Sequence, residues 1–153
     1  MSRELIFLHG NAIPRCTAVV DKTFDYFTLQ YMAAGELELR RGERAYRLRG
    51  AWAWSAYPGP PVRFALAPGC PYWVHRYIAF QGPRVAHWQA EGIWLTTPQQ
   101  PRDPERFGAT FDLLLSHALS GDRWRELRAV NLLEGMLIDL AEEGPDYPSI
   151  GLA

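Results

Sequence analysis

The chain has little of what marks several large classes of protein. Its two cysteines, Cys16 and Cys70, are too few for a disulfide framework and too far apart for a chelating pair. Its formal net charge is −1, so it lacks the basic excess with which a domain grips duplex DNA by itself. Its longest early apolar run, residues 5–8, is shorter than a signal-peptide core, and no stretch approaches a membrane span. We therefore expect a cytoplasmic protein with no membrane partner.

Signatures of catalysis and metal binding are also missing. The four histidines, His9, His75, His87 and His117, form no HxH or HxxxH pair that would supply neighbouring metal ligands. The sequence has no G-x-S-x-G elbow, P-loop or Rossmann glycine pattern. We therefore expect no metal, no cofactor and no enzymatic activity.

Charged residues are interleaved where they are densest. Five arginines lie between residues 40 and 49, but Glu36, Glu38 and Glu43 are mixed with them. We interpret this segment as a solvated strand-and-turn face rather than a nucleic-acid patch.

The composition fits one soluble globular domain: 153 residues, of which 48% are hydrophobic and 22% charged. Up to about residue 98 the chain alternates short strand-like stretches with glycine and proline turns. The predicted strands are residues 17–20, 27–33, 36–40, 45–48, 52–56, 62–66 and 72–80. Many short strands with such turns predict an antiparallel sandwich or small barrel.

The C-terminal third shows helical spacing instead. The sequence predicts one helix over residues 107–119 and a second that begins after Asp122, a good N-cap, and ends at Gly144. One apolar stripe of the second helix is expected to pack against the rest of the domain. It consists of Leu127, Val130, Leu133, Leu137 and Leu140.

The same helix carries a second, narrower stripe. Its members are Trp124, Leu127, Asn131, Gly135 and Ile138. A small residue lets a partner backbone approach closely, and one asparagine in an apolar seam can fix the register of two helices. We interpret the stripe as a dimer interface; the alternative is an ordinary exposed face with a few apolar residues.

The stretch 72–80 is the most informative strand. Alternation places Trp73, His75, Tyr77 and Ala79 on one face and Val74, Ile78 and Phe80 on the other. An aromatic ring beside a histidine suits a sugar, because the ring covers the C–H face while the imidazole bonds a hydroxyl. The alternative, which the pattern by itself favours, is a core histidine bonded to a backbone carbonyl.

These features together resemble a known family. Residues 27–35, 50–59, 73–82 and 124–134 occur in the order and spacing of the N-terminal effector-binding and dimerisation domain of AraC/XylS-type bacterial transcription regulators. The resemblance implies a mostly β fold, a cupin-type double-stranded β-helix (a jelly-roll barrel) followed by two α-helices. The second helix would pair with its copy in an antiparallel homodimer. The implied parts are an N-terminal arm at 1–16, the barrel at 17–104, a two-helix dimerisation segment at 105–144 and the start of a linker at 145–153.

The resemblance also implies a site. The effector would lie inside the barrel, closed in by the arm, and the matching positions are Lys22, Phe64, Trp73, His75 and Tyr77. Sugar-binding members have arginine, tyrosine and tryptophan where this chain has Lys22, Phe64 and Tyr77. Because of these differences we do not expect arabinose to be the effector, and we expect another small polar, sugar-like molecule. DNA would be bound only through a C-terminal helix-turn-helix domain, and the chain ends at Ala153, where the linker to it would begin.

Two other functions stay open at this point. One is a metal-dependent cupin enzyme, although the histidines and glutamate that metal-binding cupins carry on their early strands have no counterpart in residues 36–47 or 58–64. The other is a pure dimerisation module whose barrel is filled by its own aromatic side chains, since the chain has six tryptophans and seven tyrosines.

Overall fold

Two four-stranded antiparallel sheets form the body of the molecule. The computed structural model describes residues 4–144, and the predicted linker at 145–153 lies outside that range. The first sheet, sheet A, has the strand order β1 (Ile6–Cys16), β8 (Trp73–Gln81), β3 (Phe27–Ala34) and β6 (Trp52–Ala56). The second, sheet B, has the order β2 (Val20–Lys22), β7 (Val62–Leu66), β4 (Glu36–Arg41) and β5 (Arg44–Arg49). The predicted antiparallel sandwich is confirmed.

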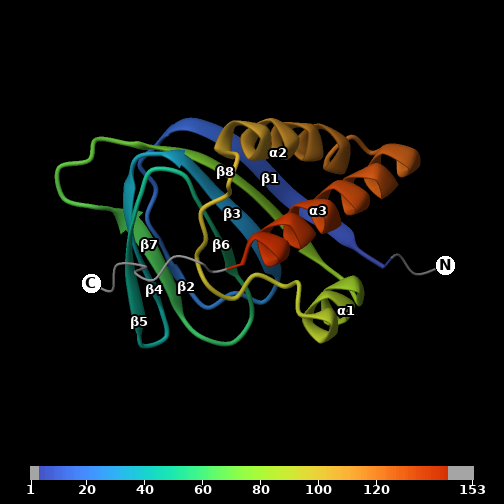
Figure 1. The fold of residues 1–153 in the computed structure, drawn as a ribbon, viewed down its shortest axis with the longest axis horizontal. Coiled ribbons are helices and arrows are strands. Elements are labelled where there is room, and N and C mark those ends of the chain that lie inside the picture. The colour runs from blue at the N-terminus through green and yellow to red at the C-terminus, as the bar shows by residue number, and fades with distance from the viewer. Residues whose placement is uncertain (1–3, 145–153) are drawn as a thin grey trace.

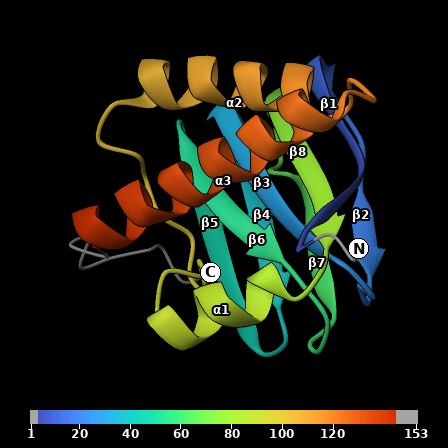
Figure 2. The same ribbon diagram turned by 90° about the vertical axis from the view of Figure 1, so that its right-hand side faces the viewer.

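Three helices complete the fold: α1 (Arg84–Glu91), α2 (Pro104–Ala118) and α3 (Arg123–Glu143). Helices α2 and α3 lie side by side against sheet A, and α1 lies near one end of the sandwich (Figures 1 and 2). Both long helices have side-chain caps: Asp103 accepts a hydrogen bond from the backbone N–H of Arg106, and Asp122 accepts one from that of Arg125. The backbone N–H of Gly144 closes α3 on the Leu140 carbonyl at 3.0 Å.

Two hydrophobic cores divide the side chains of sheet A between them. The outer core joins the sheet's outer face to the helices through Leu29, Tyr31, Ile78, Phe80 and residues of α2 and α3. The inner core fills the space between the two sheets. Its large members are Trp54, Trp73, Phe64, Met32, Leu37 and Leu48.

Sheet register sets the position of the inward-facing histidine and tyrosine of β8. His75 is paired between Ile13 of β1 and Met32 of β3. Tyr77 is paired between Asn11 and Gln30 in the same way. Both side chains therefore come from a central strand of sheet A.

Two elements were not predicted from the sequence. Strand β1 has mostly exposed side chains and no clean alternation, so its edge pairing with β8 fixes it rather than its own pattern. At Gly10 an added Cβ would lie 2.7 Å from the Tyr77 carbonyl oxygen and 2.9 Å from Leu115, so β1 approaches β8 and α2 closely. Helix α1 has no side-chain cap at Pro83 and no acidic residue in its first turn.

Two expectations about burial are wrong. Leu127 is 48% exposed and does not belong to the packing stripe of α3; Ala129 and Met136 are buried there instead. Arg41 is not part of a solvated face, because it occupies an inward position of β4. Its guanidinium donates to the backbone carbonyls of Ser55, at 2.8 Å, and Thr96.

Candidate functional site

Strand β8 directs Trp73, His75 and Tyr77 toward the space between the sheets. Trp73 is 0% exposed within the inner core and His75 is 6% exposed, whereas Ile78 and Phe80 belong to the outer core. The predicted alternation of this strand is confirmed. Whether its inward side chains bind an effector stays a prediction.

The three inward rings of β8 follow one another along the strand. The ring centroids of Trp73 and His75 are 4.0 Å apart. Those of His75 and Tyr77 are 5.3 Å apart, with an angle of 20° between the ring planes. The imidazole is therefore held between two aromatic rings and has little freedom to rotate.

His75 is neutral and only half satisfied by hydrogen bonds. Its Nε2 lies 2.7 Å from Oε1 of Gln30, while its buried Nδ1 has no hydrogen-bond partner among the described residues. Burial lowers the pKa of His75 to about 3, because the charged imidazolium is poorly solvated there. The site therefore offers an uncharged imidazole with one nitrogen open to a further hydrogen bond.

Aromatic side chains from both sheets surround Trp73. Phe64 of β7 lies with its centroid 6.2 Å from that of Trp73 and 5.4 Å from that of Trp54. The two tryptophan rings are 5.9 Å apart. The indole N–H groups of both, and the hydroxyl of Tyr46, are buried without a hydrogen-bond partner in the described part of the chain. Four of the five predicted ligand residues, Phe64, Trp73, His75 and Tyr77, thus form one continuous series of ring contacts.

The fifth predicted residue, Lys22, lies farther out on β2. Its ammonium donates to the Tyr26 hydroxyl at 2.8 Å and is exposed to solvent. His9 of β1 packs between the rings of Tyr26 and Tyr77, and its Nδ1 is 3.2 Å from the Tyr77 hydroxyl. Burial raises the pKa of Tyr77, and the nearby Lys22 charge opposes that rise. Lys22 therefore joins the site through Tyr26 and Tyr77 rather than through His75.

Sequence reasoning missed several side chains of this region. Alternation along residues 27–33 would have placed Thr28 and Gln30 on the inward face, so a signal for them existed. No pattern marks His9, because β1 does not alternate. The missed residues are His9, Tyr26, Thr28, Gln30, Tyr46 and Trp54.

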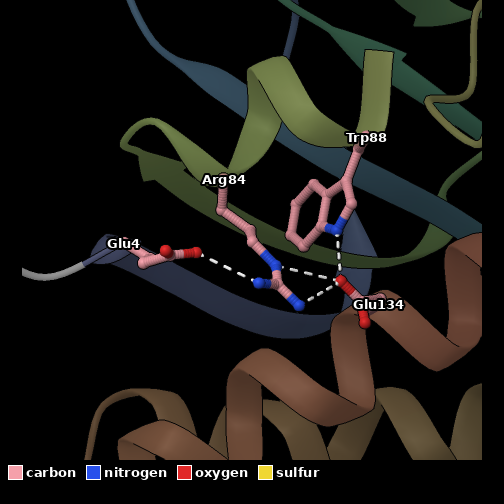
Figure 3. A network of polar contacts seen from close by, with 4 residues as sticks. All are labelled: Glu4, Arg84, Trp88 and Glu134. Carbon is pink, nitrogen blue, oxygen red and sulfur yellow. Dashed lines mark hydrogen bonds and ion pairs between the residues drawn. The ribbon is translucent and has the colours of Figure 1, made fainter. Parts of the chain in front are cut away.

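A polar network joins the start of the chain to α1 and α3 (Figure 3). The Glu134 carboxylate accepts hydrogen bonds from the Trp88 indole N–H at 2.6 Å and from Nε and Nη2 of Arg84 at 3.0 and 2.7 Å. Arg84 also reaches Glu4, just before β1, at 3.0 Å. The Trp88 hydrogen bond, together with Arg84, lowers the pKa of Glu134. The network therefore ties the N-terminal segment to the long C-terminal helix.

The second stripe of α3 points away from the sheets. Trp124 is 65% exposed, Leu127 48% and Ile138 45%. Asn131 and Gly135 line a groove of about 400 Å³ whose other wall includes Arg106 and Thr110 of α2. An apolar stripe beside a groove is a surface that a partner can cover.

The described residues, 4–144, hold neither a cluster of metal-ligating side chains nor a membrane-spanning helix. No group of three or more His, Cys, Asp or Glu side chains in that range is arranged to hold a metal ion. No helix there is both long enough and apolar enough to cross a membrane.

A family model matches most of the chain. Residues 18–135 match the family model described as the AraC-like ligand binding domain, a family of regulatory domains with a cupin-like β-sandwich. No curated protein sequence matches the chain. The matched range begins in the loop after β1 and ends within α3, and so includes the inward face of β8 and most of the helical layer. The chain therefore belongs to the family of AraC-like ligand binding domains.

Proposed function

We propose that this domain senses a sugar or similar small polar effector for a bacterial transcription regulator that works in the cytoplasm. The effector would bind at His75 and Tyr77, and the domain would form a homodimer through α3. DNA would be bound by a helix-turn-helix domain of the same regulator, beyond Ala153. The observation that carries the proposal is the half-satisfied imidazole of His75, buried between two rings inside a sandwich of this family.

The ring pair His75–Tyr77 supports a sugar because it combines the two kinds of contact that a sugar needs. An aromatic face covers apolar C–H groups, while a neutral nitrogen and a phenol hydroxyl bond to hydroxyl groups. Lys22 adds a cation at the outer end of the same series of contacts. It is suited to a sugar acid, whose carboxylate it would pair with.

Strand β1 is suited to link effector binding with α3. His9 contacts Tyr77 of the proposed site, and Glu4, just before the strand, contacts Arg84, which bonds to Glu134 of α3. An effector that holds β1 in place would favour the arrangement in which this network is closed. The effector can shift that equilibrium only by the difference between its affinities for the two arrangements.

Calorimetry with a panel of aldoses and sugar acids tests the site. We expect at least one compound to bind, and both His75→Ala and Tyr77→Ala to weaken binding about tenfold or more, because each removes a direct contact. His87→Ala, on the exposed face of α1, is the matched control and should bind like the original protein. Unchanged binding in both site variants would remove the proposed pocket.

The spacing of the α3 stripe supports the homodimer. Trp124 and Ile138 lie seven residues on either side of Asn131, and Leu127 and Gly135 lie four residues on either side. In an antiparallel pair with its two-fold axis at Asn131, Leu127 of one copy would face Gly135 of the other. An added Cβ at Gly135 would meet no atom within 4 Å, so there is room for that side chain.

Sedimentation velocity tests the dimer. The double change Asn131→Ala and Ile138→Asp should yield a monomer, because it places a charge in the apolar seam. Leu113→Asp, at a similarly exposed leucine of α2, should leave a dimer. A dimer that survives the double change would place the interface elsewhere.

A second candidate function is a dimerisation module whose sandwich is filled by its own side chains. Trp54, Phe64 and Trp73 favour it, because all three are at most 1% exposed and pack against one another. In that case no compound would bind between the sheets, and the α3 variants would still disrupt the dimer.

A further inference from the structure

A chain of hydrogen bonds lies behind His75 and runs across the inner face of sheet A. His75 Nε2 is 2.7 Å from Gln30 Oε1, and Gln30 Nε2 donates to Thr28 Oγ1 at 3.1 Å. The Thr28 hydroxyl donates to the carbonyl of Ala56 and accepts from its N–H, both at 3.1 Å. Thr28 and Ala56 are paired in the sheet, so the far end of the chain is anchored to backbone.

The Ala56 carbonyl, at the far end of this series of hydrogen bonds, fixes which group is the donor in each bond. A backbone carbonyl only accepts, so the single Thr28 hydroxyl proton is donated to Ala56. Thr28 Oγ1 can then only accept from Gln30, which places the amide N–H₂ of Gln30 toward Thr28 and its oxygen toward His75. The His75 Nε2 must therefore carry the proton.

Nδ1 of His75 is consequently a bare acceptor. A neutral imidazole carries one proton, and burial, which keeps the ring neutral, prevents a second from binding near pH 7. The nearest ring along the strand, Trp73, contributes an unpartnered N–H, as does Trp54. Among the described residues, the inner core thus offers one unpartnered acceptor, His75 Nδ1, and the unpartnered donors of two indoles and of the Tyr46 hydroxyl. The buried guanidinium of Arg41 is already bonded to the Ser55 and Thr96 carbonyls.

We infer that Gln30 and Thr28 are positioning residues that fix His75 as a hydrogen-bond acceptor, so that the effector must present a hydroxyl that donates to Nδ1. The same effector carries acceptor oxygens for the indole N–H groups. This describes an uncharged, hydroxyl-bearing part of the ligand. The ligand class rests on the proposed function, whereas the tautomer of His75 is a property of the protein without ligand.

Nitrogen NMR of the imidazoles in the ligand-free protein tests the tautomer. We expect a single tautomer for His75 at pH 7, protonated at Nε2, with the signal assigned by its loss in His75→Gln. Thr28→Val and Gln30→Met should each produce a mixture of tautomers. The first removes the hydroxyl that orients the Gln30 amide, and the second removes the amide oxygen that accepts from His75 Nε2. Thr28→Ser keeps the hydroxyl and should restore the single tautomer, which loss of packing would not explain.

Two results would overturn the tautomer assignment. One is a proton on Nδ1 of His75 in the unchanged protein, and the other is an unaltered single tautomer in both Thr28→Val and Gln30→Met. Circular dichroism of each variant checks that it is folded, and two variants at different links keep the test decisive if one does not fold.

Calorimetry with matched sugars tests the donated hydroxyl. The probes are D-glucose, D-galactose, D-xylose and L-arabinose, each compared with its monodeoxy and mono-O-methyl derivatives. For a sugar that binds, the monodeoxy and the mono-O-methyl derivative at one ring position should both bind about tenfold or more weakly than the parent sugar. The O-methyl group keeps the acceptor oxygen of that hydroxyl but has lost its donated proton. Full affinity of every O-methyl derivative would overturn the donated hydroxyl. If neither these sugars nor the sugar acids of the first panel bind, the sugar class of the proposed function fails, while the NMR result on His75 stands by itself.

Discussion

Side chains of sheet A alternate between its two faces, but the outer face packs against the helices and the inner face packs against sheet B. Leu29 and Ile78 on the outer face are buried under the helices, while Gln30 and His75, on the same two strands, face the other sheet. The outer face is apolar, and its burial under the helices favours folding. The inner face carries buried polar side chains, which cost free energy unless they are bonded.

The two faces of sheet A also differ in whether their buried polar atoms have hydrogen-bond partners. In the outer core the Tyr31 hydroxyl donates to the Pro104 carbonyl at 3.0 Å and the Trp88 indole donates to Glu134; Trp94 is the exception, with an unpartnered N–H. On the inner side Trp54 and Trp73 both lack a partner. The outer face is therefore completed by the protein's own chain, whereas the inner face retains donors and an acceptor that a ligand can satisfy.

The largest expected effect is on the outer face. Phe111→Ala removes a fully buried ring that packs against Tyr31 and Phe107. We expect it to lower the free energy of unfolding by about 3–5 kcal/mol in urea titrations. Leu113→Ala, at an exposed leucine two residues along the same helix, should change it by less than about 0.5 kcal/mol. Equal effects of the two changes would show that the outer core does not dominate stability.

The inner face should dominate the pH dependence. The pKa of His75 is lowered from 6.5 to about 3 on folding, so between these values the unfolded chain binds a proton that the folded chain does not. The free energy of unfolding should therefore fall as pH falls below about 6.5, with His75 contributing about 1.4 kcal/mol per pH unit until the pH nears 3.

Urea titrations between pH 7 and 4.5 measure this contribution. His75→Gln should reduce the slope, whereas His87→Gln, at an exposed histidine, should leave it unchanged. An unchanged slope in His75→Gln would show that the histidine is not held neutral on the inner face.

An intermediate loss in the free energy of unfolding is expected at the edge of the outer core. Glu134→Ala leaves the buried Trp88 N–H without its acceptor and leaves the Arg84 guanidinium with Glu4, which should cost about 1–3 kcal/mol. Glu142→Ala, an exposed glutamate of the same helix, is the control. Hydrogen exchange should also show faster opening of β1 in Glu134→Ala, and unchanged exchange there would mean that the network does not hold the N-terminal segment.

The smallest effect is expected at the ion pair on the outer rim. Arg76 of β8 donates to both carboxylate oxygens of Asp112 on α2, at 2.7 and 3.1 Å, but Asp112 is about half exposed. Asp112→Asn should therefore lower the free energy of unfolding by about 0.5 kcal/mol, and by less in high salt. A loss as large as that of Phe111→Ala would contradict the assignment of stability to the apolar core.

Strands that are bounded by proline- and glycine-rich turns could be predicted from the sequence. Strands β6 and β7 have the predicted bounds, 52–56 and 62–66, because the proline- and glycine-rich segment 58–61 separates two stretches rich in aromatic and β-branched residues. Strand β1 and helix α1 could not be predicted in this way. The first is held by its neighbour in the sheet, and the second is one short helix without a side-chain cap.

The sequence by itself determined which side chains share a face: the inward rings of β8 and the exposed stripe of α3 follow from periods of two and of about 3.6 residues. Only the tertiary structure decided what those faces meet. Gln30 reaches His75 across 45 positions of sequence, and Arg41 is buried because β4 turns it toward the carbonyls of distant segments. Such contacts depend on the register between strands, and a shift of one residue would move every side chain of a strand to the opposite face.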